Sequence, residues 1–421
     1  MSDERPTLVI ADIAARPRIR VAGSPRPKVL VAGAGIGGLV AALSLARRGI
    51  AVEVHEQAQA LREVGAGVQV SPNGVRVLAA LGVAARVAAV SSETRGKEMR
   101  LWNTGQAWSP FDVLADSVGT YGFPYFTVYR PDLLAVLEAA VREAAPGAIH
   151  LGRRAEGFDV LPEGRVRLRF ADGGVAEGDV LVGADGIHSV VRRGLWGEAA
   201  ARFTGLMAWR GVIPMERLPA RMNRAVGTNW IGPGRHVVHY PLRGGALMNF
   251  VGVVEGVDWQ VESWTAQGTR AELHRDFAGW HDDVHAMIAA IDTPFRWAFL
   301  ARDPLPVWGR GPVTLLGDAC HPTLPFMAQG AVQAIEDGFI LARALAQVED
   351  PIQALRRYED ARRDRTARMV RASNDNTTRF HNPELAHEAG AAAYIAREFE
   401  EKKVRDRYDW LYTYDAEAVP I

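Results

Sequence analysis

Three short motifs rich in glycine and aspartate contain the residues of this 421-residue chain that could do chemistry. They are GAGIGG at Gly33–Gly38, GADG at Gly183–Gly186, and the pair Gly317-Asp318. A glycine turn lets backbone N–H groups approach a pyrophosphate, and carboxylates bind sugar hydroxyls. A domain that binds only a nicotinamide dinucleotide would need the first motif but neither of the others. We therefore predict that one larger dinucleotide, FAD, is held by segments drawn from the whole chain.

The first motif has the surroundings of a dinucleotide-binding βαβ unit. An apolar run at 29–32 predicts a buried parallel strand, and 39–46 is a good helix former. A second strand is predicted at 51–56, and Glu56 ends it 23 residues after the first glycine of the motif. A carboxylate at that place accepts hydrogen bonds from a ribose. Glu53 is the alternative acid, but it lies within the strand, so we prefer Glu56.

The small residues of the first motif have predicted roles at the dinucleotide. Gly33 allows the tight turn, and Gly35 lets the backbone approach the pyrophosphate. Gly38 allows the helix to pack closely on the strand. Ile36 stands in the same turn, beside a helix N-terminus whose dipole favours the phosphates. We predict that these four residues and Glu56 bind FAD.

Composition favours a cytoplasmic enzyme of two or three domains. Lysine plus arginine (49) equals aspartate plus glutamate (49), which gives no electrostatic case for nucleic acid or an anionic membrane surface. No apolar run approaches the ~18 residues of a membrane-spanning helix, and the N-terminus lacks a signal-peptide core. The single cysteine, Cys320, excludes internal disulfides and cysteine-based metal clusters. We expect Cys320 and the neighbouring His321 to be structural, no metal, and a monomer or homodimer.

Strand patterns change in character along the chain. Alternating runs at 155–160 and 166–170 predict antiparallel strands, and 179–182 predicts a buried strand that leads into the second motif. Between 203 and 299, strand-like segments predict an antiparallel sheet inserted into the first domain. Its clearest strands are 206–213, 236–241 and 246–254.

Helices are predicted on either side of that insertion. Residues 73–90 are alanine-rich and helical, and Pro131 suits the first turn of a helix over 133–145. A long helix is predicted from 330 to about 348. The arginine-rich stretch 355–371 also contains acidic residues, and we interpret it as a solvated helix face.

These patterns predict an α/β fold with a Rossmann-like FAD-binding domain, an inserted antiparallel-sheet substrate domain and C-terminal helices. Only one dinucleotide fingerprint occurs, so NADH or NADPH would bind transiently rather than in a domain of its own. The predicted divisions are an N-terminal extension (1–26), a discontinuous FAD-binding domain (27–96, 122–199 and 300–348), a substrate-binding domain (97–121 and 200–299) and a C-terminal helical region (349–421).

In these motifs the chain resembles the single-component FAD-dependent aromatic monooxygenases, which have the p-hydroxybenzoate hydroxylase-like fold. The resemblance extends over about residues 27–415. Four segments carry it: Gly33–Gly38, Gly183–Arg192, Gly317–Ala331 and Trp410–Asp415. Within this family the chain is similar to the subgroup of salicylate hydroxylase, 6-hydroxynicotinate 3-monooxygenase and 3-hydroxybenzoate 6-hydroxylase.

The resemblance assigns cofactor contacts to the second and third motifs. It implies that Asp318 binds the ribityl hydroxyls of FAD and that Arg130 contacts its ribityl and phosphate region. Asp185 is implied in binding FAD and the pyridine nucleotide, although a simple left-handed turn would need only Gly186. The segment 325–331 would pass along the flavin ring, with its backbone N–H groups at the N1/O2 edge. Its candidate cofactor-binding residues are Gln329, Gly330 and Ala331, and Pro325 is a candidate catalytic residue beside the ring.

The resemblance also implies a reaction among NADH or NADPH, molecular oxygen and a small aromatic substrate. The nicotinamide would reduce the flavin and leave, and oxygen would then form a flavin C4a-hydroperoxide. That species would hydroxylate a phenolic or hydroxypyridine carboxylic acid such as salicylate, with loss of CO2 where the carboxylate occupies the attacked carbon. The protein would orient the ring, exclude water and make the substrate more nucleophilic.

The last of these tasks calls for a base, because a phenol with a pKa of about 10 is mostly neutral at physiological pH. Strand alternation places His236 and Tyr240 on one face of the inserted sheet and His239 on the other. We predict His236 and Tyr240 as substrate-facing catalytic residues and Trp209 as an aromatic wall. Some relatives carry a histidine base in the strand that reads 205–210 here, where this chain has none. The base is therefore elsewhere or dispensable, and a structural role for each histidine is the alternative.

Two other classes of protein remain as alternatives. One is another FAD oxidoreductase of the same fold, a halogenase or a lipid oxidase. The halogenase pattern Trp-x-Trp-x-Ile-Pro, however, is not formed before Ile213-Pro214. The other is a non-catalytic flavin-fold binding protein, which would not need Arg130 or the segment 325–330. A yellow colour of the purified protein would separate an enzyme from this last class.

Overall fold

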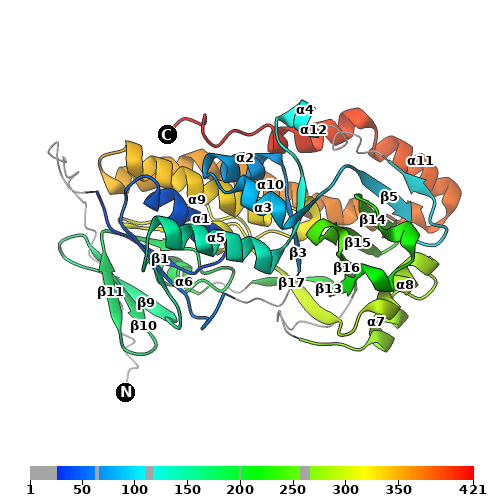
Figure 1. Cartoon of the computed structure of the whole chain (residues 1–421), viewed down its shortest axis with the longest axis horizontal. Helices are drawn as coiled ribbons and strands as arrows, with labels where there is room; N and C mark the ends of the chain where they lie inside the picture. The colour runs from blue at the N-terminus through cyan, green and yellow to red at the C-terminus, as the bar shows by residue number, and fades with distance from the viewer. Residues whose placement is uncertain (1–25, 62–65, 110–116, 199–200, 257–265) are drawn as a thin grey trace, which may run out of the picture.

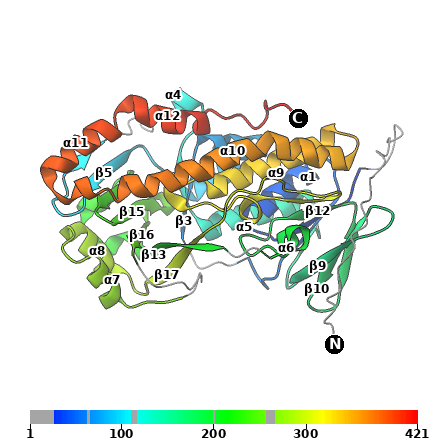
Figure 2. The same ribbon diagram turned by 180° about the vertical axis from the view of Figure 1, so that it is seen from behind.

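The computed structural model describes residues 26–61, 66–109, 117–198, 201–256 and 266–421. The predicted N-terminal extension lies outside these ranges except for Arg26. Figure 1 shows an elongated molecule, with a parallel sheet and its helices towards one end and an antiparallel sheet towards the other. Two long helices, α9 (Gly330–Gln347) and α10 (Pro351–Phe380), run side by side along the molecule (Figure 2).

The parallel sheet has five strands in the order β18-β12-β1-β2-β8. Its strands are short and apolar, as expected where protein covers both faces of a sheet. All neighbours pair in parallel, so the carboxyl ends of β18, β12 and β1 meet at one edge. Each of these three strands leads directly into one of the glycine motifs. The bounds are β1 Val29–Ala32, β2 Val52–His55, β8 Ile149–His150, β12 Val180–Gly183 and β18 Val313–Leu315.

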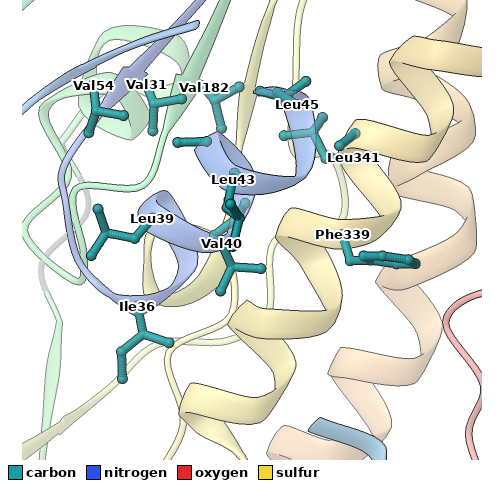
Figure 3. Packing of buried hydrophobic residues seen from close by; sticks show 14 of the residues in the cluster. Val31, Ile36, Leu39, Val40, Leu43, Leu45, Val54, Val182, Phe339 and Leu341 are labelled. Atoms are coloured by element: carbon teal, nitrogen blue, oxygen red, sulfur yellow. The ribbon is translucent and has the colours of Figure 1, made fainter. Parts of the chain in front are cut away.

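Helix α1 (Ile36–Ala46) packs between α9 and α5 (Arg130–Ala144) and forms much of the core beside this sheet. A β-carbon on Gly338 would lie 2.6 Å from the backbone nitrogen of Ala41, so α9 and α1 approach as closely as glycine permits. The buried side chains of these helices in Figure 3 include Val40, Leu43, Phe339 and Leu341.

The second sheet has seven strands in the order β17-β13-β16-β15-β14-β5-β6, and only β14 and β5 pair in parallel. This is the inserted antiparallel sheet that the alternating patterns predicted. Helices α7 (Arg270–Asp276) and α8 (Asp282–Ala290) cover one of its faces. The strand bounds are β5 Lys97–Leu101, β6 Ala107–Trp108, β13 Arg202–Pro214, β14 Gly227–Gly232, β15 Arg235–Leu242, β16 Leu247–Glu255 and β17 Phe295–Ala301.

The other face of this sheet packs against the segment 324–327 and against the C-terminal helices. Residues from both 97–108 and 202–301 build the sheet, and the exact division of the chain into domains stays a prediction. Two three-stranded sheets lie outside it, β3-β7-β4 and β11-β10-β9. Their bounds are β3 Gly67–Val70, β4 Ser91–Glu93, β7 Phe126–Tyr129, β9 Ala155–Val160, β10 Val166–Phe170 and β11 Val175–Gly178.

The prediction of one continuous helix over 73–90 is wrong. The structure has two helices there, α2 (Pro72–Ala80) and α3 (Ala84–Ala89). Gly82 between them has φ +62°, the left-handed conformation that ends helices. The remaining α-helices are α4 Ser117–Tyr121, α6 Val190–Trp196, α11 Glu388–Glu398 and α12 Glu401–Tyr412.

Candidate active site

The first motif forms a tight turn that requires glycine at two positions. Gly33 has φ +103°, and a β-carbon there would lie 2.5 Å from the carbonyl oxygen of Ala184. A β-carbon on Gly38 would lie 2.1 Å from the carbonyl oxygen of Gly33. Gly35, in contrast, has nothing within 4 Å of its missing side chain. The turn is therefore packed on its inner side and open at Gly35 and the N-terminus of α1, which begins at Ile36, and this shape fits a pyrophosphate.

Glu56 lies next to this turn, and its carboxylate is oriented by backbone donors. It accepts hydrogen bonds from the backbone N–H of Ala34 at 2.8 Å and of Ala58 at 2.9 Å. The alternative acid, Glu53, instead pairs with Lys28 at 2.8 Å. The structure therefore places Glu56, and not Glu53, beside the glycine turn, where a ribose would be bound.

Asp185, in the second motif, has a structural task at the start of α6. Its carboxylate accepts hydrogen bonds from the hydroxyl of Ser189 and from the backbone N–H of Val190 at 2.7 Å and Val191 at 3.2 Å. Burial raises the pKa of this carboxyl group. The left-handed turn at Gly186 therefore does not leave Asp185 idle, because its side chain caps the helix. These contacts lie within the protein, so the role of Asp185 in binding FAD and the pyridine nucleotide stays a prediction.

Asp318 follows β18 at the edge where the three motifs meet. Its side chain is accessible to solvent, yet it lies deep enough among protein atoms that burial raises its pKa. Arg130 and His321 act against this rise, so a positive guanidinium stands near the carboxylate. Arg130 is the first residue of α5, and its backbone N–H donates to Ala66 at 2.9 Å. A solvent-exposed acid with an arginine nearby suits a polar ligand rich in hydroxyls and phosphates.

A buried network of charged side chains joins α9 to α10 behind this edge. Arg362 donates to Glu336 at 2.6 Å and to Asp337 at 2.7 Å, and none of the three side chains is exposed. Arg365 donates to Glu336 at 2.9 Å. The interpretation of 355–371 as a solvated helix face is therefore wrong for Arg362. Two adjacent acids inside a mostly apolar helix were the signal that could have revealed the network.

Asp337 connects this network to the loop that carries Asp318. Its carboxylate accepts from the backbone N–H of Gly317 at 3.1 Å and pairs with Nε2 of His321 at 2.7 Å. Burial alone would raise the pKa of Asp337, but His321 and Arg362 hold it below its usual value. The ionised carboxylate thus fixes the turn before Asp318, and His321 is buried in the structural role predicted for it.

The segment predicted to pass along the flavin ring is a short 3₁₀ turn followed by the start of α9. Pro325 is exposed, whereas the side chain of Gln329 is fully buried. Gln329 donates to the hydroxyl of Ser71 at 2.9 Å, so its side chain belongs to the fold rather than to a ligand. Ala328 has φ +53°, unusual for a residue other than glycine. Gly330 and Ala331 open α9, whose N-terminus supplies partial positive charge at this edge.

One face of the seven-stranded sheet contacts this segment. The ring of His236 lies 5.1 Å from that of Phe326, between centroids. Tyr240, on the same face, contacts Gly67, because a β-carbon there would lie 2.5 Å from the tyrosine ring. Burial raises the pKa of Tyr240 although Arg210 acts against this. The structure thus brings both predicted catalytic residues to the face that looks towards the cofactor edge.

Trp209 is not brought together with these two residues. Its indole N–H donates to Asp276 of α7 at 2.7 Å, and its ring packs in the cluster beneath α7 and α8. Strand β13 is covered on both faces, and the pattern of apolar residues did not show which face each helix covers. The predicted aromatic wall therefore lies on the wrong side of the sheet for a substrate next to His236, and we leave Trp209 out of the site.

Two residues that sequence reasoning missed lie beside the predicted pair. His381, at the end of α10, approaches Nδ1 of His236 with its Nε2 at 2.6 Å. Gln69 of β3 accepts from the hydroxyl of Tyr125 at 2.8 Å and also interacts with Tyr240. Neither residue lies in a recognisable motif, so the sequence carried no signal for them beyond the polarity of Gln69 in a short strand.

Within the described ranges there is no cluster of histidine, cysteine, aspartate or glutamate that could hold a metal ion. Among the helices that the structure describes, none is long and apolar enough to cross a membrane. Cys320 is buried, as expected.

A parallel sheet carries the three motifs at one edge, and an antiparallel sheet faces that edge. This arrangement defines a flavoprotein. Residues 26–373 match the family described as the FAD binding domain, and the chain belongs to that family. The predicted family, fold class and FAD cofactor are confirmed. The protein is an enzyme of the flavoprotein monooxygenase class, as the resemblance implied.

Several relatives match almost the whole chain. The 3-amino-4-hydroxybenzoate 2-monooxygenase of Streptomyces platensis is 37% identical over 94% of this chain and 98% of its own length. The 6-hydroxynicotinate 3-monooxygenase of Bordetella bronchiseptica is 34% identical over 94% of this chain and 97% of its own. Among solved structures, Klebsiella pneumoniae HpxO with FAD and uric acid has a TM-score of 0.79 and 30% identity, covering 93% of this chain and 97% of that protein.

Proposed function

We propose that this protein uses NADH or NADPH and molecular oxygen to hydroxylate a phenolic or hydroxypyridine carboxylic acid. The meeting of the three motifs at one sheet edge, opposite a sheet face with His236 and Tyr240, is the observation that carries the proposal. The named substrates of two close relatives, 3-amino-4-hydroxybenzoate and 6-hydroxynicotinate, support the substrate class. Both are aromatic acids with a hydroxyl group that a base could deprotonate.

The described residues would bind FAD in three places. The open turn at Gly35 and the N-terminus of α1 would take the pyrophosphate, and Glu56 a ribose. Asp318 would bind ribityl hydroxyls, with Arg130 beside it. When bound, FAD supplies hydride acceptance and oxygen activation, which no side chain can provide. The backbone of 325–331 would lie along the ring, where the α9 dipole stabilises negative charge.

The sheet face would orient the aromatic acid and make it reactive. Tyr240 and His236 are buried, with 4% and 1% of their surface exposed, so protein shields both side chains from bulk water. Burial and the nearby His381 keep the pKa of His236 well below its usual value, so its imidazole is neutral near pH 7. A neutral imidazole can accept the phenolic proton, and the resulting phenolate is the better nucleophile. Tyr240 would then hold the ring by a hydrogen bond from its hydroxyl.

The test is a screen of the purified protein for NADH and NADPH oxidation with product identification. The panel contains 3-amino-4-hydroxybenzoate, 6-hydroxynicotinate, salicylate, 3- and 4-hydroxybenzoate and uric acid. We expect a yellow protein and a hydroxylated product from one of the aromatic acids. A colourless protein that takes up no FAD would contradict the proposal, and turnover of uric acid alone would replace the substrate class by a purine.

We also propose that the enzyme works in the cytoplasm as a monomer or homodimer. A single buried cysteine suits a reducing compartment. Light scattering of the purified protein measures the oligomeric state, and cell fractionation measures the location. A trimer or larger assembly, or recovery outside the cytoplasm, would contradict this part.

A further inference from the structure

A polar cleft lies on the face of the antiparallel sheet that α7 and α8 cover, opposite to the predicted catalytic pair. Its volume is about 70 Å³, and its lining comes from β5, β14, β15, the segment 220–226 and the start of α8. Trp230 of β14 and His239 of β15 line it from the sheet and are 1% and 6% exposed. A water molecule needs about 10–15 Å³ of such space, so the cleft has room for several waters or for one small ion.

The acidic side chains of this cleft are already paired with arginines. Glu98 accepts from Arg100 at 2.9 Å and from Arg224 at 3.0 Å. Asp283 accepts from Arg221 and, at 3.5 Å, from Arg100. The side chains of Arg221 and Arg224 are 63% and 46% exposed, so they stand at the mouth of the cleft. Three guanidinium groups thus face two carboxylates, which leaves an excess of one positive charge and of N–H donors.

Two buried polar atoms of the cleft have no hydrogen-bond partner among the described residues. They are the indole nitrogen Nε1 of Trp230 and the imidazole nitrogen Nδ1 of His239. An indole N–H can only donate, so it needs an acceptor, and a buried donor without one destabilises the fold. A ligand with negatively charged oxygens would supply acceptors to the indole and to the guanidinium groups, and would balance the excess charge.

We propose that this cleft binds one small oxyanion, either inorganic phosphate or the carboxylate of a small acid, at a site separate from the active site. Trp230 would donate to the ligand from the sheet, and Arg221 and Arg224 would contact it from the mouth. His239 directly precedes Tyr240 on β15, so the ligand would lie behind the strand that carries both predicted catalytic residues. The inference does not depend on the proposed function.

The titration of His239 should report the bound anion. Burial lowers the pKa of this histidine to about 4. The charged side chains that act on it are Glu98 and Asp283, which raise its pKa, and Arg100 and Arg224, which lower it. The other histidine near the cleft is His281 at the start of α8, whose Nδ1 accepts from the backbone N–H of Asp283 at 3.1 Å. An added negative charge would favour the protonated form of His239 and raise its pKa.

The first experiment follows the tryptophan indole signals of the nitrogen-labelled holoprotein by NMR while inorganic phosphate is added at constant ionic strength. The signal of Trp230, identified by its loss in Trp230→Phe, should shift and reach saturation. Arg224→Gln should weaken phosphate binding about tenfold, the effect of losing a charged hydrogen bond. The matched control is Arg217→Gln, because Arg217 is 45% exposed and paired with Asp292 outside the cleft, and it should bind as the wild type does.

Three results of this experiment would overturn the proposal. The first is a Trp230 signal that does not saturate, which means that the cleft holds water only. The second is an equal shift when sodium chloride replaces phosphate, which means that ionic strength alone acts on the signal. The third is the same phosphate affinity in Arg224→Gln and in the wild type. FAD content, measured by flavin absorbance, checks that each variant is folded.

The second experiment distinguishes the two sources of the oxyanion and locates the site. Saturation by phosphate but not by acetate assigns the cleft to phosphate, and saturation by both extends it to carboxylates. With an aromatic acid, a change in flavin absorbance reports binding at the active site, whereas the Trp230 signal reports the cleft. His239, observed by nitrogen NMR, should titrate at a higher pH with saturating phosphate than without it. An unchanged titration of His239 would place the anion elsewhere and contradict the assignment.

Discussion

The cofactor edge and the substrate face are built in different ways. At the cofactor edge the backbone sets the shape, because Gly33 and Gly38 leave no room for a β-carbon. The charges behind that edge are fully paired, as for Arg362 with Glu336 and Asp337. At the substrate face the side chains set the shape, and the buried groups there include His236, Tyr240 and the arginine Arg210, which acts on Tyr240. Substitutions at the cofactor edge are therefore limited by the close packing of the backbone, whereas the shape of the substrate face depends on its side chains.

The largest expected effect tests the pairing behind the cofactor edge. Arg362→Leu leaves Asp337 and Glu336 without their shared buried partner, although Arg365 still reaches Glu336. We expect a loss of about 3 kcal/mol or more in the free energy of unfolding, measured by urea denaturation. The control is Arg357→Leu, an exposed position on the same helix, where a change within about 0.5 kcal/mol is expected. Equal effects in the two variants would show that the network is not stabilising.

The second effect concerns FAD itself. Asp318→Ala removes the carboxylate at the meeting point of the three motifs and should weaken FAD binding about ten- to hundredfold, the range for a charged hydrogen bond. Flavin absorbance after gel filtration, with titration calorimetry on the apoprotein, measures this change. Asp303→Ala, an exposed position between β17 and β18, is the control. Full retention of a reducible flavin in Asp318→Ala would contradict the assignment.

The third effect separates the two faces of the antiparallel sheet. His236→Ala and Tyr240→Phe should lower the product formed per NADH or NADPH oxidised, by about tenfold for the histidine, because an unactivated substrate reacts slowly. FAD content should stay at the wild-type level. Trp209→Phe, on the opposite face, is the matched control and should give normal product yield. A fall in yield for Trp209→Phe as large as for His236→Ala would place the substrate on the other side of the sheet.

The smallest effect compares one buried histidine from each region under acid. Burial lowers the pKa of His55, the last residue of β2 in the parallel sheet, and of His239, on the antiparallel sheet, to about 4. Below about pH 6.5 the unfolded chain binds protons that the folded protein does not. The stability that each neutral histidine contributes is therefore complete above the ordinary pKa of about 6.5 and is lost as the pH drops below that value. We expect each group to remove about 1 kcal/mol between about pH 7 and pH 5.5. Urea unfolding of His55→Gln and His239→Gln at both pH values should show a weaker dependence, and an unchanged one would contradict the assignment.

The sequence predicted the cofactor edge well because its signals are local. A glycine turn, a buried strand and a helix start lie within a few residues, and the strand at 29–32 was placed at its observed bounds. The substrate face was predicted only in part, since alternation relates His236 to Tyr240 but not to the helices that cover each face. For that reason Trp209 was placed on the wrong side. Arg362 contacts Asp337, 25 residues away along the chain, and His236 contacts His381, 145 residues away. No pattern in the sequence related these pairs.

The order of strands in the parallel sheet has a consequence for how the protein folds during its synthesis on the ribosome. The first and third motifs, which meet at one edge, are 284 residues apart in the sequence. Until β18 and α9 have emerged, the nascent chain exposes an unpaired edge of β12 and has no complete nucleotide pocket. Such distant pairings form slowly, so early translation products need protection from aggregation. Capture of the yellow cofactor would accordingly mark the moment at which synthesis of the whole domain is finished.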